Sequence, residues 1–399
     1  MRFIGIQHRV KLSADEELRP TRVAIIEGDK VQQLELATEQ DELDFVLGTL
    51  NGAEGLHQGD TIAMVLGGSG DYLAYALARQ AEKVGGSVMR IPSFLLKRER
   101  GAQEATPVRF GEPETKPKKR GRKKEKTAED DILLARLALR KPQLFYPLAA
   151  RDQDLILVRE RWRALWEAMQ ARMACNLRLR QYFIGRLFTQ PEGLFPEGGI
   201  EKAFDAAKTS DTILSALEEE EKRREKELEK ALKGFALYEQ VFRPVEGLGT
   251  KIGARLIAAI VDIRRFETDA QLKAFCGVHV LPDGRFPRQR TGEVANWHGD
   301  ARQALVLFAE QANRRPDSYW GKYLRQMKAN LRAKHPVPIN VEVSDKENGG
   351  TKMVTRYSDG HIHAMAEWRT ATRFVEWLHK RWWRFERGEA LEQPERQAA

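Results

Sequence analysis

Three acidic residues, Glu129, Asp130 and Asp131, stand directly before a helical pattern in the stretch KTAEDDILLARL. Neighbouring carboxylates can hold hard cations such as Mg²⁺, because these cations prefer anionic oxygen ligands. The same acids can also cap the helix and occupy its first turn, where the helix dipole favours negative charge. Both interpretations, a metal site and a helix start, stay open from these residues alone.

A glycine turn further along the chain could bind phosphate. In VEGLGTKIGARLIAAIVDIRRF, the turn from Gly247 to Gly249 precedes a helix that we expect to begin near Thr250. Backbone N–H groups at a helix N-terminus can hold a phosphate, and the small residues Gly253 and Ala254 let a second helix approach closely. The pattern is typical of helix–hairpin–helix units that bind DNA independently of sequence. A helix pair without a ligand is the alternative.

Cationic residues are clustered along the chain. Seven of them lie within residues 116–124, where Pro117 and Gly121 block regular structure. We predict a basic loop over residues 111–127 that contacts phosphate, with a solvated linker as the alternative. The residues predicted to bind nucleic acid are Lys118, Lys119, Arg120, Arg122, Lys123, Gly247, Gly249, Lys251, Arg255, Arg288, Arg290, Arg381 and Arg384.

The overall composition points to a polyanionic partner. The 67 Lys and Arg residues outnumber the 58 Asp and Glu residues in the 399-residue chain, which gives a formal charge of +9. Nucleic acid, and DNA in particular, is therefore the expected partner. Cys175 and Cys276 have no spacing typical of a zinc site or a disulfide framework. No stretch approaches eighteen apolar residues, so we expect a cytoplasmic protein without a membrane partner.

The expected elements give an α/β region followed by helical regions. Residues 1–35 read as strands with a turn at Gly28-Asp29, followed by a helix near 39–51, a strand at 61–68, a helix at 71–85 and a strand at 87–92. This order predicts a mixed sheet covered by helices, as in the RNase H-like fold. We expect an RNase H-like domain over 1–140, a helical region with a long charged arm over 141–243, and a helix–hairpin–helix domain over 244–399.

The arm is expected from two charged helical segments. Residues 129–190 are rich in arginine, and from Ser210 glutamates and lysines recur at helical spacing while apolar residues are sparse. We predict a long antiparallel arm or coiled coil that joins copies of the chain into a dimer or tetramer. A solvated spacer is the alternative. Trp162, Trp166 and Phe183 are expected in the core instead of serving as stacking platforms for bases.

Several segments together resemble a known family. VEGLGTKIGARLIAAIVDIRRFETDAQLKAFCGV resembles the C-terminal domain of insertion-sequence transposases that include bridge-RNA-guided recombinases and pilin-gene invertases. HGDARQALVLFAEQ at 298–311 and DGHIHAMAEWRTATRFVEWLHKRWW at 359–383 resemble further segments of that family. Residues 1–140 are similar to its Holliday-junction-resolvase-like domain, which carries an Asp-Glu-Asp-Asp quartet. The resemblance implies DNA transposition or site-specific recombination, with DNA and a structured guide RNA as partners.

The sequence departs from this family at its catalytic positions. The first aspartate of the quartet falls on Gln7, in FIGIQH, and the glutamate falls on Val65, in AMVLGG. Asp130 and Asp131 are the candidates for retained acids. The family also has a serine nucleophile after its helix–hairpin–helix, but LPDGRFPRQRTGEVANW has no serine. Thr291 is the candidate hydroxyl nucleophile there, and the alternative is that the neighbouring arginines and Asn296 contact only a phosphate backbone.

Neutral residues in place of metal ligands should weaken Mg²⁺ binding severely. We therefore interpret the chain as a nucleic-acid-binding protein on a recombinase scaffold that no longer cleaves strands and has no cofactor. One alternative is an active recombinase with Mg²⁺, in which Glu129, Asp130, Asp131 and Asp15 or Glu27 rebuild the site and Thr291 attacks. The other is an oligomeric scaffold built on the charged helix at 210–240.

Overall fold

The computed structural model describes residues 1–9, 20–50, 55–67, 69–104, 130–148, 150–190, 198–281, 284–289, 295–344 and 350–391. The chain divides into two compact units. The first contains Met1–Ile156 and Arg264–Glu267, and the second contains Leu157–Ile263 and Thr268–Ala399. The division into three domains at residues 140 and 243 stays a prediction.

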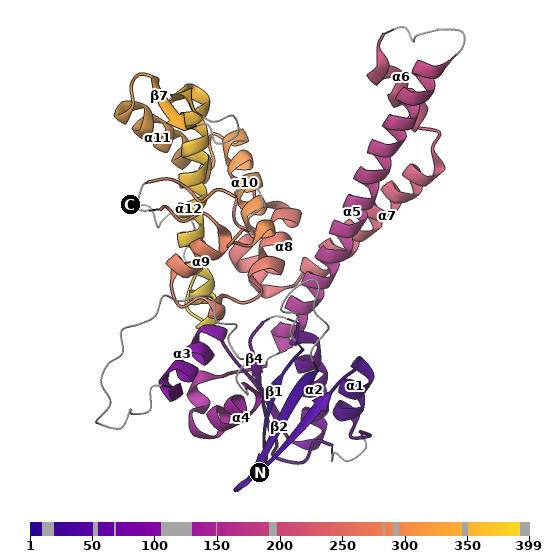
Figure 1. The fold of residues 1–399 in the computed structure, drawn as a ribbon, viewed down its shortest axis with the longest axis vertical. Coiled ribbons are helices and arrows are strands. Elements are labelled where there is room, and N and C mark those ends of the chain that lie inside the picture. The colour runs from indigo at the N-terminus through magenta and orange to yellow at the C-terminus, as the bar shows by residue number, and fades with distance from the viewer. Residues whose placement is uncertain are drawn as a thin grey trace. The chain divides into compact units, whose positions relative to one another are not determined.

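A mixed six-stranded sheet forms the centre of the first unit (Figure 1). Its order is β3-β2-β1-β4-β5-β6. The strands are β1 (Phe3–Gln7), β2 (Thr21–Glu27), β3 (Lys30–Leu36), β4 (Thr61–Val65), β5 (Ser87–Ile91) and β6 (Tyr146–Pro147). β1 pairs parallel with β4, and β4 pairs parallel with β5, while the other neighbours are antiparallel. The predicted mixed sheet and the predicted turn at Gly28 are confirmed.

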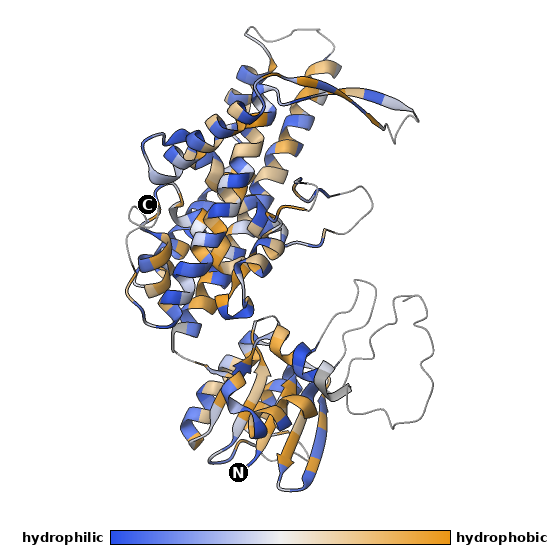
Figure 2. Ribbon diagram, turned by 90° about the vertical axis from the view of Figure 1, so that its left-hand side faces the viewer, coloured by the Kyte–Doolittle hydropathy of each residue, from blue (hydrophilic) through white to orange (hydrophobic). Residues whose placement is uncertain are grey.

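Helices cover both faces of this sheet. Buried residues of α1 (Glu39–Leu47) and α2 (Asp71–Val84) pack on one face against Ile4 and Ile6. Buried residues of α3 (Ser93–Glu104) and α4 (Asp130–Arg140) form a second core with Ala63 and Ile91. The short helix η1 (Pro142–Leu144) follows α4. Figure 2 shows the largely hydrophobic strands between these helices.

Gly5 allows α4 to lie directly on β1. A Cβ atom at this position would lie 1.9 Å from the Asp131 carbonyl oxygen and 2.6 Å from the Ala135 nitrogen. Only a residue without a side chain permits so close a backbone approach. The sequence stretch that begins the chain therefore fixes the position of Asp131 over the sheet.

The second unit contains the predicted antiparallel arm. It is formed by α5 (Ala150–Thr189), which belongs to this unit from Leu157 onward, α6 (Ile200–Lys208) and α7 (Thr212–Leu232). The helices α5 and α7 lie side by side in Figure 1. Arg161 pairs with Glu227, and Arg172 with Glu221, so residue numbers rise along one helix as they fall along the other. Two glutamates of α7 thus bind arginines of α5 in the same chain.

The remaining helices of the second unit pack around an aromatic core. They are η2 (Tyr238–Phe242), α8 (Gly249–Ile260), α9 (Asp269–Cys276), α10 (Gly299–Arg314), α11 (Tyr319–Lys334) and α12 (Asp359–Glu386). Phe308, Trp320 and Phe374 are buried and in mutual ring contact. Trp162 is also buried, as predicted for the core. The segment η3 (Ile263–Arg265) joins α8 to α9.

A β-hairpin extends from the helices of the second unit (Figure 2). It consists of β7 (Ile339–Ser344) and β8 (Thr351–Arg356), paired antiparallel. The hairpin predicted between residues 340 and 361 is confirmed. None of the helices in the described ranges combines the length and the apolar character needed to cross a membrane.

Candidate functional site

Gln7 and Val65 end two neighbouring parallel strands. The register of β1 and β4 sets Phe3 beside Thr61 and Gly5 beside Ala63, so the carboxyl ends of both strands lie at the same sheet edge. Ligands of α/β sheets bind at such edges. Because side chains alternate along a strand, Gln7 and Gly5 face the same side, toward α4. The Gln7 Oε1 atom is buried there without a hydrogen-bond partner.

Asp131 is a buried carboxylate on the same face of the sheet. Gln33 Nε2 donates a hydrogen bond of 2.9 Å to Asp131 Oδ2, while Asp131 Oδ1 is buried without a partner. The close approach of α4 to Gly5 places this carboxylate over the sheet. The structure therefore brings Asp131 and Gln7 to one face of the sheet, while a catalytic role for Asp131 stays a prediction.

Asp130 faces a different partner. Arg100 of α3 donates hydrogen bonds to both of its carboxylate oxygens, at distances of 2.6 to 3.1 Å. Both side chains are largely buried, at 26% exposure for Arg100 and 12% for Asp130. This bidentate pair joins α3 to α4, so in this structure the Asp130 carboxylate is held by a guanidinium.

The described residues do not fit a pair of magnesium ions. Gln7 offers a neutral amide oxygen, Val65 offers no donor atom, and Asp131 is the carboxylate that faces them. Arg22 of β2 pairs with Gln7, and Glu27 lies five residues further along the same strand. The Cα atoms of Arg22 and Glu27 are therefore about 17 Å apart, and Glu27 lies at the far end of β2 from Gln7. Within the described ranges, no group of three or more His, Cys, Asp or Glu residues could hold a metal ion. Glu129 and Asp15 lie outside those ranges.

The glycine turn at residues 247–249 has the predicted geometry. Gly247 and Gly249 have φ angles of 86° and 57°, a region that favours glycine, and α8 begins at Gly249. Gly253 lies against Tyr238, because a Cβ atom there would be 3.0 Å from the tyrosine ring. The predicted helix start and the close-packing face of α8 are confirmed.

Two cationic residues lie at or beside this turn. Lys251, in the first turn of α8, forms an ion pair of 2.8 Å with Glu225 of α7. Arg315 is exposed, and its side chain lies 3.6 Å from the place of a Cβ on Gly247. Arg315 was not among the residues predicted to bind nucleic acid, although Arg314-Arg315-Pro316 ends a helix and offers an exposed basic group.

Two of the predicted phosphate contacts are buried. Arg255 Nη2 lies 2.7 Å from Asp300 Oδ1 and 2.6 Å from Gln303 Oε1, and its guanidinium lies over the Trp166 ring at 4.5 Å. Arg381 Nη2 donates to the Gln240 carbonyl oxygen at 2.8 Å. These contacts favour a role for both arginines in packing the helical unit, while phosphate binding by either residue stays a prediction.

Arg288 is exposed on the segment that precedes the expected nucleophile, and Arg384 is half-buried on α12. The other predicted residues lie outside the described ranges, and the prediction that they contact phosphate or act as a nucleophile is untested. They are Thr291, Arg290, Lys118, Lys119, Arg120, Arg122 and Lys123.

A second missed residue, Arg302, lies near the segment that carries Arg288. Its guanidinium lies over the rings of both Trp297 and Trp368, with Cζ 4.4 and 4.6 Å from the two ring centroids. Nη2 donates to the Pro287 carbonyl oxygen at 2.8 Å, and burial lowers the pKa of the guanidinium. The contact ties α10 to the segment at 284–289, so Arg302 positions Arg288.

One segment of the helical unit matches a known family. Residues 239–325, from η2 into α11, match the model described as Transposase IS116/IS110/IS902 family. This range contains the glycine turn, Lys251, Arg288 and Arg302. No curated protein matches the chain. Residues 239–325 therefore form a transposase domain of the IS116/IS110/IS902 family.

Proposed function

We propose that this chain binds DNA in transposition or site-specific recombination and has lost metal-dependent strand cleavage. The transposase match over residues 239–325 supports the DNA partner. The loss of strand cleavage is inferred from the carboxyl edge of β1 and β4. There a neutral amide at Gln7 and an apolar side chain at Val65 end the two strands on which the resemblance to the family predicts acids.

The strand order supports an RNase H-like fold for the first unit. An antiparallel β3-β2-β1 ladder followed by the parallel strands β4 and β5 has the order that this fold requires. In such a sheet, the carboxyl ends of β1 and β4 are the expected place for metal-binding acids. Asp131 contributes one carboxylate, which is too little charge to hold two divalent cations.

DNA contact is assigned to the exposed cations of the second unit. Arg288 and Arg315 present guanidinium groups, and the Gly247–Gly249 turn presents the N-terminus of α8, where the helix dipole favours an anion. Lys251 would exchange Glu225 for a phosphate. The basic segment at 116–124, a structured RNA partner and a dimer or tetramer stay predictions from the sequence.

The test is the affinity of the full chain for a labelled DNA duplex, measured by fluorescence anisotropy between 50 and 200 mM salt. The logarithm of the affinity falls linearly with the logarithm of the salt concentration, and each lost phosphate contact makes this fall shallower by about one unit of slope. We expect this change for Arg288→Ala. Arg223→Ala is the matched control, because Arg223 is an exposed arginine held by Glu220 and Glu227 on the arm. An affinity for DNA that is unchanged across this salt range would overturn the proposal.

A further inference from the structure

Two polar residues meet at the carboxyl edge of β1 and β4, on the face opposite Asp131. His8 directly follows β1, and Ser69 follows β4 in the turn that leads into α2. From this edge, the chain continues from β1 to β2 on one side and from β4 through α2 to β5 on the other. Such a change of direction between parallel strands leaves space for a ligand. The fold thus places a histidine and an exposed serine where active sites of α/β sheets lie.

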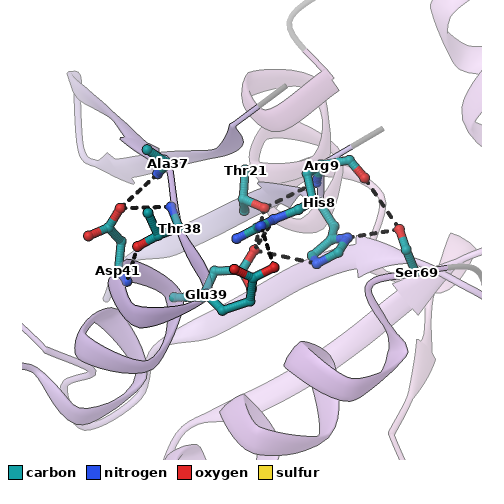
Figure 3. A network of polar contacts seen from close by, with 9 residues as sticks. His8, Arg9, Thr21, Ala37, Thr38, Glu39, Asp41 and Ser69 are labelled. Atoms are coloured by element: carbon teal, nitrogen blue, oxygen red, sulfur yellow. Dashed lines mark hydrogen bonds and ion pairs between the residues drawn. The ribbon is translucent and has the colours of Figure 1, made fainter. Parts of the chain in front are cut away.

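The contacts arrange Ser69, His8 and Glu42 in series. Figure 3 shows His8 with Ser69 on one side and Arg9 and Thr21 nearby. His8 Nδ1 lies 2.8 Å from Ser69 Oγ, and His8 Nε2 lies 3.4 Å from Glu42 Oε1. Glu42 is itself held, because Thr21 Oγ1 donates to Oε1 at 2.6 Å and Arg9 Nε donates at 3.1 Å. Glu42 and Thr21 are buried while Ser69 is exposed. The series runs from a fixed carboxylate to a hydroxyl that solvent can reach.

The electrostatics favour a neutral histidine. Burial lowers the pKa of His8, and the carboxylate of Glu42 opposes this in part. The charge of Arg9 lowers this pKa further, whereas a hydrogen bond to the Arg9 backbone and the carboxylate of Asp71 raise it, and the net change is downward. A neutral ring with its proton on Nε2 directs that N–H toward Glu42. Nδ1 then has a lone pair that can accept the Ser69 hydroxyl proton. This is the arrangement in which a histidine acts as a general base toward a nucleophile.

We propose that Ser69 is a nucleophile toward acyl esters, with His8 as its general base and Glu42 as the residue that positions His8. As Ser69 Oγ bonds to the carbonyl carbon, its proton passes to His8 Nδ1 and the carbonyl π pair moves to oxygen. When the carbonyl re-forms, the alkoxide leaves and takes the proton from Nδ1. Water then attacks the acyl-serine by the same proton transfers and releases the acid.

The charges around Ser69 favour an acyl over a phosphoryl centre. Transfer of a phosphoryl group needs cations at the several charged oxygens of its transition state. Arg9 is bound to Glu39 and Glu42, so its charge is already neutralised. A carbonyl ester develops one oxyanion, which backbone N–H donors can stabilise. The first turn of α2 follows Ser69 directly and contains such donors.

The competing explanation is structural. Ser69 Oγ also lies 3.3 Å from the Arg9 carbonyl oxygen, and the hydroxyl could close the turn by donating there. In that case Ser69 would react no faster than another exposed serine, and its reaction would not depend on His8. Ser93 at the start of α3 is a matched comparison, because it is exposed and lies in the same unit.

The test is labelling of the full chain by a fluorophosphonate, which bonds to a serine oxygen as fluoride leaves, with the modified residue identified by mass spectrometry. We expect labelling of Ser69 at least about a hundredfold faster than that of Ser93, and a fall to the Ser93 rate in His8→Asn. p-Nitrophenyl acetate hydrolysis should be lost in Ser69→Ala and kept in Ser93→Ala. Labelling of Ser69 at the Ser93 rate in the unaltered protein overturns the proposal, whether or not the variants fold.

The role of Glu42 is tested separately by the pH dependence of labelling. Because the carboxylate raises the pKa of His8, Glu42→Gln should move the midpoint of the pH–labelling profile to lower pH as well as slow the reaction. A Glu42 that only stabilises the fold would leave this midpoint unchanged. Since the reaction needs no DNA, its failure leaves the proposed DNA binding untouched, and loss of DNA binding leaves the labelling result valid.

Discussion

Replacing Gly5 by alanine should destabilise the first unit through a single added methyl group. The new Cβ would lie 1.9 Å from the Asp131 carbonyl oxygen and 2.6 Å from the Ala135 nitrogen. The first distance is about 1.5 Å shorter than ordinary van der Waals contact. Both obstacles are backbone atoms of α4, so a rotamer change cannot relieve the clash and the helix must move off the sheet.

The cost follows from this geometry. Overpacking a filled core typically costs about 1–3 kcal/mol, and we expect about 3 kcal/mol because helix backbone must shift. This free energy corresponds to a roughly hundredfold rise in the unfolded fraction of the unit. Gly101→Ala is the control, since the methyl group there would meet no atom within 4 Å.

Hydrogen exchange of the full chain, read by mass spectrometry on peptides from β1 and α4, measures this change. Gly5→Ala should lower protection of both peptides by about a hundredfold, and Gly101→Ala should not. All eight tryptophans lie at or after Trp162, so tryptophan fluorescence reports the second unit separately. Protection in Gly5→Ala within a few-fold of the unaltered protein would refute the close contact between α4 and β1, and with it the placement of Asp131.

Three further predictions concern other contacts. Arg100→Met should cost about 1–3 kcal/mol by leaving the largely buried Asp130 carboxylate unpaired, measured by urea unfolding, whereas a surface pair would cost less than 1 kcal/mol. Burial alone would raise the pKa of Glu376, but hydrogen bonds, including one from Lys273, lower it overall. The contribution of Glu376 to stability should therefore be complete above about pH 4.3 and lost as the pH falls through the lowered pKa. Lys273→Met should weaken this loss of stability at low pH, measured by thermal unfolding at pH 3–7. Arg302→Lys should lower stability by about 1–2 kcal/mol, since an ammonium group cannot stack on the two indole rings as a planar guanidinium can, and an unchanged melting temperature would contradict this role.

Local sequence patterns predicted most of the elements of the fold. Apolar patterns placed the strands β1 to β5, and helical periodicity placed α2 and α7, while the resemblance to the transposase family placed α12. The glycines at 247 and 249 predicted the turn before α8, because both need a backbone conformation that other residues avoid. These features depend on neighbours in the chain, and a single sequence contains that information.

Contacts between distant residues could not be predicted in the same way. The bidentate pair of Arg100 with Asp130 depends on how α3 and α4 pack on the sheet, and nothing near Asp130 in the sequence indicates it. Arg255 looks like any basic residue on a helix, yet tertiary packing encloses it between Asp300 and the Trp166 ring. The type of an ionisable residue is thus visible in the sequence, while its partner is set by the fold.

The same limit applied to His8. His8 stands beside Gln7 in FIGIQH. The resemblance to the transposase family predicts an aspartate at position 7 and gives no role to position 8. The proximity of His8 to Ser69, 61 residues later, follows from the parallel pairing of β1 with β4. A prediction of that pairing, joined to a search for polar residues just after each strand, would have found both residues.

The most direct test of the central claim is strand nicking of supercoiled and branched DNA in Mg²⁺ or Mn²⁺, under conditions where binding of the same DNA is seen. We expect the unaltered protein to bind this DNA without metal-dependent nicking. Metal-dependent nicking that disappears in Asp131→Asn would contradict it, because the acids at the sheet edge would then hold a working metal site.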